Sequence, residues 1–251
     1  MSISPPASWR RPYKTLIIAS TPRSGSNFFC RKLRSTGVLG NPTEYFRHWD
    51  TPDVTTAERC LLAAEKGRTD NGVVAFKLFP EHFERLQKDI RLSEWFPDPI
   101  WVHLERKDLL GQAISLARAM QDGVWSSGKE PMKDALYSRW AIEASLAKIV
   151  ANNGRWAAYF ARTGTEPLRV FYEDISDEVD NVCQRIGTRL GLAAPVPSTG
   201  DVDMTQQRDA QNDDWRRLFL AEAGDQSSFP ATIIPTGALK RKKPKWMFWK
   251  Q

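Results

Sequence analysis

The chain has 251 residues, of which 41% are hydrophobic, which is enough for the core of one large α/β domain. No apolar stretch reaches the roughly 20 residues of a membrane-spanning helix, and the N-terminus lacks the apolar centre of a secretory signal. The net charge of +6 belongs to the last twelve residues, because the remaining chain has 30 basic and 30 acidic residues, a balance that disfavours a nucleic-acid-binding protein.

Strands and helices are expected to alternate along the chain. In chain order, we expect a strand over 14–20, a helix over 26–36, an aromatic-rich loop over 41–50, a helix over 55–66, a strand over 72–79, a helix over 81–92, a strand over 99–105, helices over 109–121 and 135–160, a strand and turn over 167–175, and helices over 176–190 and 206–222. This order predicts βαβ units, and therefore an α/β fold with a central, mainly parallel sheet flanked by helices, a P-loop-like three-layer sandwich. We expect one domain over residues 1–239, followed by a basic, aromatic tail over residues 240–251.

Cysteine is sparse and shows no metal-ligand spacing. Cys30, Cys60 and Cys183 lie far apart in the chain. An odd, scattered set is typical of buried free thiols in a reducing compartment, so we expect a cytoplasmic protein.

The first strand runs directly into a loop whose residues suit an anion. Arg23, Ser24, Gly25 and Ser26 stand between the strand and the helix that follows. In an open α/β fold, such a loop presents backbone N–H groups and the positive end of the helix dipole, while glycine allows close approach of a ligand. The alternative is a turn with an N-cap serine and a surface arginine. A nucleotide-triphosphatase loop is disfavoured, because Ser26 stands where that motif requires lysine.

A later strand and helix repeat this arrangement. Arg106 and Lys107 follow the strand over 99–105, and Ser115 lies on the next helix. Because the carboxyl ends of parallel strands meet at one edge, both loops are expected to bind a single ligand with two separated phosphate-type groups. Taken alone, these residues would be surface cations and a helix serine.

The chain resembles sulfotransferases that use 3′-phosphoadenosine 5′-phosphosulfate, most closely the bacterial trehalose 2-sulfotransferase family of carbohydrate sulfotransferases. The resemblance extends over about residues 15 to 215, and its first and third segments are the most specific. The matching segments are "ASTPRSGSNFFCRKLRSTGVLGNPTEYF", "GVVAFKLF", "ERKDLLGQAISLARAMQDGVW", "VFYEDI" and "QQRDAQNDDW".

The resemblance implies how the donor, 3′-phosphoadenosine 5′-phosphosulfate, is bound, with no metal. The 3′-phosphate would be held by Arg106 or Lys107 together with Ser115, and Arg208 is a candidate for a segment that closes over the nucleotide, although a surface arginine is an alternative. The residues that would bind the 5′-phosphosulfate are Arg23, Ser24, Gly25, Ser26 and Asn27.

A base must accept the proton of the acceptor hydroxyl. The resemblance places a glutamate in the loop after the first helix, where this chain has Glu44, whereas many other sulfotransferases use a histidine, for which His48 is the candidate. Arg23 is expected to stabilise the charge on the leaving phosphate, and Lys77 could assist unless it only extends its ammonium group to solvent. His103 is expected to be structural, and His82 to lie on a helix surface.

The acceptor pocket is expected near the same loop, with Asn41 among its residues. Tyr45, Phe46, Trp49 and Trp125 are candidates for flat walls on which a sugar stacks, with packing in the core as the alternative. In the trehalose enzyme a glutamine that contacts the sugar precedes the loop arginine, whereas this chain has Pro22 there, which puts trehalose as acceptor in question.

Other partners and functions remain open from the sequence. The resemblance implies a homodimer and a carbohydrate or glycolipid acceptor, and no nucleic-acid partner is expected. The tail over 240–251 combines cations with Trp, Met and Phe, so a peripheral membrane contact is one hypothesis and a disordered or self-packed tail the other. The alternative functions are a P-loop-type kinase or other nucleotide-phosphate enzyme, and a non-enzymatic nucleic-acid-binding module.

Overall fold

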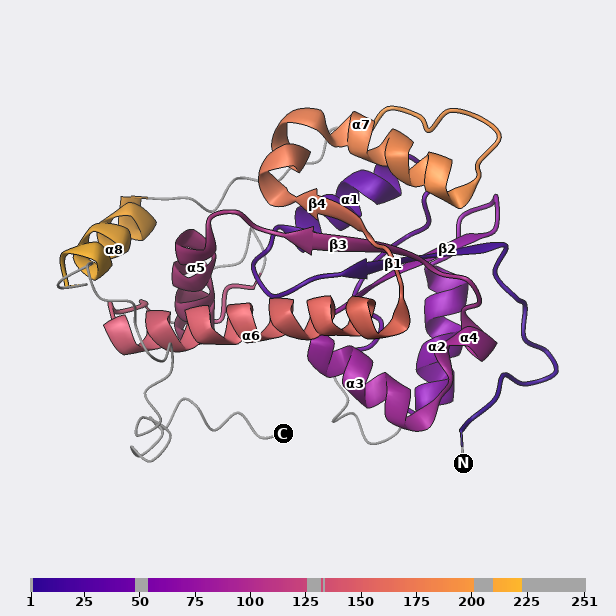
Figure 1. Ribbon diagram of the computed structural model, residues 1–251, viewed down its shortest axis with the longest axis horizontal. Helices are drawn as coiled ribbons and strands as arrows, with labels where there is room; N and C mark the ends of the chain where they lie inside the picture. The colour runs from indigo at the N-terminus through magenta and orange to yellow at the C-terminus, as the bar shows by residue number, and fades with distance from the viewer. Residues whose placement is uncertain (1, 48–53, 126–131, 133, 201–209, 223–251) are drawn as a thin grey trace. The chain divides into compact units, whose positions relative to one another are not determined.

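The structure, a computed structural model, describes residues 2–47, 54–125, 132, 134–200 and 210–222 (Figure 1). Apart from one additional short helix, its strands and helices follow the predicted order. They are β1 (Lys14–Ala19), α1 (Ser26–Ser35), α2 (Thr56–Lys66), β2 (Val73–Leu78), α3 (Pro80–Asp89), α4 (Leu92–Trp95), β3 (Ile100–Glu105), α5 (Leu109–Asp122), α6 (Arg139–Thr163), β4 (Leu168–Phe171), α7 (Tyr172–Leu190) and α8 (Ala210–Ala221).

The four strands form one parallel sheet in the order β2-β1-β3-β4. At its centre Ile17 of β1 pairs with Phe76 of β2 on one side and with Trp101 of β3 on the other. Because all four strands run the same way, their carboxyl ends lie at one edge, where the loops after β1, β2, β3 and β4 emerge. The predicted parallel α/β fold is confirmed.

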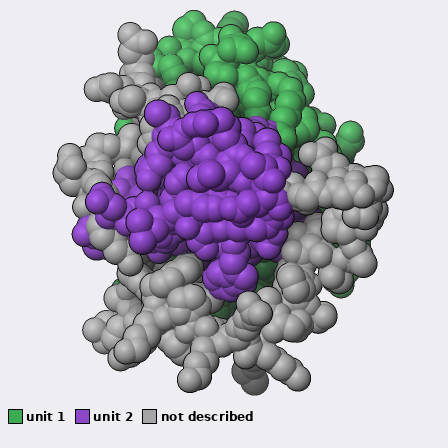
Figure 2. All heavy atoms as spheres, turned by 90° about the vertical axis from the view of Figure 1, so that its left-hand side faces the viewer, with its two compact units in different colours: residues 1–107, 152–203 green, residues 108–151, 204–251 purple. Residues whose placement is uncertain are grey.

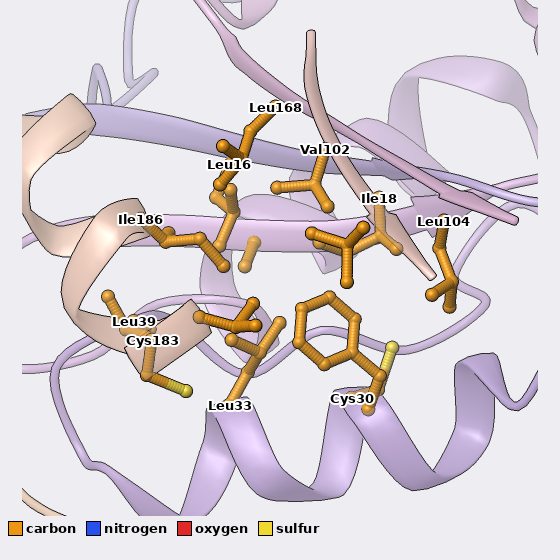
Figure 3. Packing of buried hydrophobic residues seen from close by; sticks show 14 of the residues in the cluster. Leu16, Ile18, Cys30, Leu33, Leu39, Val102, Leu104, Leu168, Cys183 and Ile186 are labelled. Atoms are coloured by element: carbon orange, nitrogen blue, oxygen red, sulfur yellow. The ribbon is translucent and has the colours of Figure 1, made fainter. Parts of the chain in front are cut away.

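One face of the sheet is covered by α1 and α7. Leu16 and Ile18 of β1 point toward Leu33 of α1, while Ile186 of α7 and Leu168 of β4 close the same cluster (Figure 3). All five are less than a tenth exposed. Alternate residues of a strand point to opposite faces, so the continuous apolar run of β1 reflects burial on both sides.

The opposite face of the sheet packs against α2, α3 and the part of α6 after residue 151, which completes three layers (Figure 1). This core is rich in aromatic residues: Phe76 and Trp101 from the sheet meet Phe83 of α3 and Trp156 of α6. Trp156 also donates from Nε1 to the carbonyl oxygen of Ser20 at 3.0 Å, so the start of the loop after β1 is anchored to this layer.

Three predicted boundaries are wrong. Residues 172–175 begin α7 instead of completing the predicted strand and turn over 167–175, since Glu173 and Asp174 occupy the first turn, where acidic groups favour a helix. The predicted helix over 81–92 ends earlier, and a separate short helix, α4, follows. The long helix α6 starts at Arg139, four residues later than expected.

The chain divides into two compact units, residues 1–107 with 152–203 and residues 108–151 with 204–251, which are coloured separately in Figure 2. The first unit contains the sheet, and the second has its own small core built from α5, the start of α6 and Trp215 of α8. The tail over residues 240–251 lies outside the described residues, so the predicted domain boundary stays a prediction. Within the described part of the chain, no helix is both long and apolar enough to cross a bilayer.

The cysteines are buried free thiols, as the sequence indicated. Burial raises the pKa of Cys30 to about 11 and that of Cys183 to about 12, and it shifts the pKa of Cys60 in the same direction. A thiol that does not ionise near neutral pH is a poor nucleophile, so these residues belong to the core and not to the chemistry.

His103 should make the protein sensitive to acid. It lies on β3 with 1% of its surface exposed, next to Phe160, and neither ring nitrogen has a hydrogen-bond partner among the described residues. Its Nδ1 is 3.5 Å from Oε2 of Glu105, too far for a strong bond, so burial dominates and, with the charge of Arg169, lowers the pKa of His103 to about 4. Because the unfolded chain binds this proton near pH 6.5, the free energy of unfolding should fall by about 3 kcal/mol between pH 6.5 and pH 4.

Urea unfolding of the wild type and of His103→Phe across this pH range measures the effect. The variant keeps an aromatic ring but has no titratable nitrogen, so its stability should decline less steeply as the pH falls. Identical pH dependence in the two proteins would contradict a structural, neutral His103.

Candidate active site

The loop between β1 and α1 has a strained backbone. Arg23 has φ 63°, in the left-handed region that side chains other than glycine rarely adopt, and Gly25, the N-cap of α1, has φ 80°. The N–H of Ser24 donates to the carbonyl oxygen of Thr21, which closes the turn. Strain of this kind is characteristic of ligand-binding loops that the surrounding structure holds in place.

Gly25 is required by its neighbour as well as by its backbone. A Cβ atom at this position would lie 2.0 Å from Cδ2 of Tyr172, the first residue of α7. Because nothing larger than hydrogen fits there, the ring of Tyr172 packs directly against the loop backbone. The sequence of the loop alone does not reveal this contact, which joins two segments far apart in the chain.

Gly25→Ala should therefore destabilise the protein by more than backbone strain alone, which costs about 1–2 kcal/mol. Gly37→Ala is a matched control, because Gly37 has φ 70° but a Cβ there would meet nothing within 4 Å. The difference between the two variants in urea unfolding isolates the clash with Tyr172. Equal losses of stability would show that the loop accommodates a side chain at residue 25.

The loop offers unused hydrogen-bonding capacity. The hydroxyl oxygen of Ser24 is buried and has no hydrogen-bond partner within the described residues. The first N–H groups of α1 have no partner inside the helix, and the positive end of its dipole points to the same place. A buried hydroxyl without a partner is costly, so this arrangement fits a ligand that accepts hydrogen bonds, such as a phosphate or sulfate.

The loop after β3 lies beside the loop after β1. Nη1 of Arg106 approaches the carbonyl oxygen of Arg23 at 3.5 Å, a long hydrogen bond. The guanidinium of Arg106 also lies over the ring of Tyr172, 5.1 Å from its centroid, which is a cation–π contact. Tyr172 therefore touches both predicted anion loops, packing against Gly25 and supporting Arg106.

Lys107 is directed elsewhere. Its Nζ forms an exposed ion pair with Asp174 at 2.7 Å, and its backbone N–H donates to Glu173. Its pKa is raised, chiefly by the hydrogen bond to Asp174. Of the two cations left open by the sequence, the geometry favours Arg106 as the one that faces the Arg23 loop.

Lys77 links the anion loop to Glu44. The loop over residues 41–47 docks on the end of β2, where the N–H of Lys77 donates to the carbonyl oxygen of Thr43 at 3.0 Å. The Lys77 side chain is only 2% exposed, and its Nζ lies 2.6 Å from Oε1 of Glu44. The same Nζ donates to Oδ1 of Asn27 at 2.7 Å and to Oγ of Ser26 at 3.2 Å. One buried cation thus holds the start of α1 and the predicted base together.

Glu44 is negatively charged at neutral pH. Burial by itself would raise its pKa, but the charge and hydrogen bond of Lys77, with smaller contributions from His82 and Arg47, outweigh burial and lower it. The side chain of Glu44 remains 20% exposed, so its carboxylate is reachable from solvent. A fixed, ionised and accessible carboxylate beside an anion loop is able to accept a proton from a bound hydroxyl group.

Three residues predicted to line the acceptor pocket have structural contacts. Phe46 is fully buried against Phe76 and Phe96, which favours the core alternative over a sugar-stacking wall. Asn41 and Tyr45 stabilise the loop over residues 41–47. Nδ2 of Asn41 donates to the carbonyl oxygen of Arg68, and the hydroxyl of Tyr45 donates to the carbonyl oxygen of Asn41, each at 2.8 Å.

Other predicted residues lie in the anion loop, in the second unit or outside what the structure describes. Pro22 is half-buried in the anion loop next to Arg23. Ser115, partly buried on α5, and Trp125, 49% exposed, belong to the second unit. The residues outside the described part of the chain are His48, Trp49 and Arg208.

The structure adds two residues that the sequence did not single out as part of the site. Tyr172 lies in the segment "VFYEDI", whose resemblance to the family was the available signal. His82, expected on a helix surface, is partly buried with an enclosed Nδ1 and lies close enough to Glu44 for their charges to interact. Within the described residues, no cluster of three or more His, Cys, Asp or Glu is arranged to hold a metal ion.

Comparison with known proteins gives one family. The family model described as Stf0 sulphotransferase matches residues 15–222. A trehalose 2-sulfotransferase of Mycobacterium tuberculosis is 28% identical, covering 85% of this chain and 96% of that protein, and one of Mycolicibacterium smegmatis is 26% identical, covering 84% and 96%.

Solved structures with some likeness are more distant. The sulfotransferase domain from the curacin biosynthetic pathway is 17% identical with a TM-score of 0.45, covering 74% of this chain and 76% of that one. A mouse sulfotransferase complexed with PAP is 12% identical with a TM-score of 0.44, covering 96% and 82%.

Proposed function

The chain belongs to the Stf0 sulphotransferase family, and from this premise we propose that it transfers a sulfuryl group from 3′-phosphoadenosine 5′-phosphosulfate to a hydroxyl group of a carbohydrate or glycolipid, with Glu44 as the general base. The observation that carries the proposal is the position of Lys77, whose Nζ contacts Ser26 and Asn27 of the anion loop and also Glu44. A donor group bound by that loop and a hydroxyl group activated by Glu44 would meet at this cation.

The residues present fit an adenosine donor with two phosphate-type groups. The 5′-phosphosulfate would be held by Arg23, Ser24 and the first N–H groups of α1, where Ser24 has an unused buried hydroxyl. Arg106, at 3.5 Å from the carbonyl oxygen of Arg23, is the favoured ligand for the 3′-phosphate. Ser26 accepts from Lys77 and keeps its own O–H as a donor. The donor supplies a sulfuryl group bonded to a phosphate that leaves as an anion.

The residues of the chain then have distinct tasks in the transfer. Glu44 accepts the proton of the acceptor hydroxyl as that oxygen bonds to sulfur and the bond between sulfur and the phosphate oxygen breaks. The electron pair of the broken bond stays on the phosphate, where Arg23 and Lys77 offset the growing negative charge. Fixed cations aimed at developing charge are usually the largest contribution to catalysis in group transfer of this kind.

A carbohydrate is the favoured acceptor class, since both similar mycobacterial proteins are named trehalose 2-sulfotransferases. Pro22 has no side-chain donor or acceptor, so we do not extend the proposal to trehalose itself. A homodimer, a cytoplasmic location and a membrane contact through residues 240–251 remain predictions. The kinase and nucleic-acid alternatives are not favoured.

Binding of 3′,5′-adenosine bisphosphate tests the donor. At 100 times its Kd, the bisphosphate should stabilise the protein by about 2.7 kcal/mol, whereas ATP with Mg²⁺ or oligonucleotides should not. Thermal unfolding with each ligand measures this. Equal stabilisation by ATP with Mg²⁺ would favour the kinase alternative, and stabilisation by oligonucleotides alone would favour the binding module.

Measuring the affinity for the bisphosphate in two variants separates the two candidate cations of the loop after β3. Arg106→Ala should weaken binding of the bisphosphate by roughly tenfold or more, since a charge-assisted hydrogen bond is lost. Lys107→Ala is the matched control on the neighbouring residue and should bind almost normally, because Lys107 is paired with Asp174. The reverse outcome would assign the 3′-phosphate to Lys107.

A further inference from the structure

We propose that the side-chain amide of Asn27 donates a hydrogen bond to the sulfuryl group during its transfer, and that Lys77 holds the amide in the orientation that allows this. The inference rests on the proposed function and deepens it, because it assigns a residue to the sulfuryl group itself and not to a phosphate. It starts from Nζ of Lys77, which contacts Ser26, Asn27 and Glu44.

The N–H groups of Lys77 are all occupied within the protein. A lysine ammonium group has three hydrogens to donate and no acceptor. Its Nζ lies 2.6 Å from Oε1 of Glu44, 2.7 Å from Oδ1 of Asn27 and 3.2 Å from Oγ of Ser26. The side chain is only 2% exposed, so the ammonium group has little room to turn elsewhere. Lys77 therefore stabilises a bound anion by its charge, while the hydrogen bonds to the sulfuryl oxygens must come from other residues.

The bond from Lys77 fixes the direction of the Asn27 amide. Because Nζ can only donate, the amide must present its oxygen to it, and Nδ2 faces away from the ammonium group. Asn27 is exposed, and Nδ2 donates no hydrogen bond within the described part of the chain. An amide nitrogen carries two N–H groups, so a ligand at this position finds donors that are already oriented.

The position of Asn27 on α1 directs these donors to the anion loop. Asn27 is the second residue of the helix after its N-cap, Gly25. Helical side chains tilt toward the N-terminus of their helix, so the amide lies over the end that has free N–H groups and the positive end of the dipole. Ser26 likewise accepts from Lys77 and keeps its O–H as a donor, and the buried hydroxyl of Ser24 has no partner among the described residues. The acceptors here are bound by Lys77, and the donors remain for an anionic ligand.

The contacts of Asn27 with its neighbours point to the sulfuryl group as the ligand of Nδ2. Oδ1 of Asn27 and Oε1 of Glu44 bind the same Nζ, so they are no further apart than the sum of its distances to them, 2.7 Å and 2.6 Å. Glu44 marks the side of the acceptor hydroxyl, whereas Ser24 and the first N–H groups of α1 mark the side of the phosphate. In an in-line transfer, sulfur lies between the acceptor oxygen and the phosphate oxygen. A donor between these two sides therefore faces the sulfuryl oxygens.

In the transfer step, Asn27 keeps its protons. The acceptor oxygen bonds to sulfur while its proton passes to Glu44, and the bond from sulfur to the phosphate oxygen breaks with its electron pair on the phosphate. The N–H of Asn27 stays bonded to a sulfuryl oxygen throughout, which holds sulfur in line between the two oxygens. Such positioning is effective because a misplacement of about 1 Å can cost about 10²-fold in rate.

A binding experiment without acceptor tests the contact directly. The intact donor and 3′,5′-adenosine bisphosphate differ only by the sulfuryl group. Asn27→Ala should weaken binding of the intact donor by about 10-fold with little change for the bisphosphate, since one hydrogen bond to a charged group is lost. Asn181→Ala, the same substitution at an exposed residue of α7, should change neither affinity. Equal weakening of both nucleotides would show that Asn27 only supports the anion loop, and would overturn the proposal.

A kinetic test uses Asn27→Asp. Aspartate keeps an oxygen for Lys77 but has no N–H group, so the variant separates support of Lys77 from donation to the sulfuryl group. Measured at saturating donor, kcat should fall by about 100-fold while the melting temperature stays near that of the wild type. Wild-type turnover by Asn27→Asp would show that Asn27 acts only through its bond to Lys77.

The outcomes separate this proposal from the proposed function. If the wild type transfers labelled sulfate and Asn27→Ala matches it in donor affinity and kcat, only the role of Asn27 is wrong. If the wild type transfers no sulfate and binds neither nucleotide, the proposed function fails and Asn27 has no sulfuryl group to bind. Folding of each variant is checked by its melting temperature, and Asn27→Asp, which keeps the bond to Lys77, decides the question if Asn27→Ala is unstable.

Discussion

Glu44→Gln is expected to lower kcat by 10²–10⁴-fold while binding of 3′,5′-adenosine bisphosphate stays close to that of the wild type. The amide is nearly the size of the carboxylate but has no lone pair basic enough to accept the acceptor's proton. The anion loop keeps Lys77, so the donor pocket should be preserved. Transfer of labelled sulfate to extracted glycans and lipids, beside bisphosphate binding, measures both effects.

A matched control is Glu65→Gln, since Glu65 is exposed and pairs with its neighbour Lys66. This variant should retain wild-type turnover. If Glu44→Gln retains full turnover, Glu44 is not the base, and His48, the other candidate from the sequence, would be tested by His48→Asn.

Lys77→Met should impair both turnover and stability. Removing one fixed cation from a site where charge develops costs about 10²–10³-fold in kcat. Breaking a buried ion pair leaves Glu44 without its partner, and because Glu44 is 20% exposed we expect a loss of about 3 kcal/mol, the low end of the usual range. Methionine keeps the length and apolar stem of lysine, so the core around β2 should pack as before.

The double variant Glu44→Gln with Lys77→Met separates these effects in urea unfolding. If the loss of stability comes from an unpaired Glu44 carboxylate, the double variant should be more stable than Lys77→Met alone. Losses that simply add would place the contribution of Lys77 in its bonds to Ser26 and Asn27 and not in the pair with Glu44.

The sequence was sufficient for the features that depend on local pattern. The apolar run of β1, the helical spacing that follows and the alternation of strands with helices predicted a parallel α/β sheet, and with it the edge at which Arg23 and Arg106 meet. Hydrophobic periodicity and turn residues carry this information because they act over a few neighbouring residues. The boundary at Tyr172 was wrong because an apolar, aromatic segment suits a strand or the first turn of a helix.

Tertiary structure alone decided which residues share the site. The contact of Lys77 with Glu44, the packing of Tyr172 against Gly25 and the burial of Phe46 join segments that are distant in sequence or separated by a turn. Hydrophobic periodicity over a few neighbouring residues does not predict such contacts. They form because parallel strands bring the loops that follow them to one edge of the sheet, where their side chains pack and form hydrogen bonds with one another. The sequence therefore determined where the proposed site lies, and the packing of the folded chain determined which groups lie together in it.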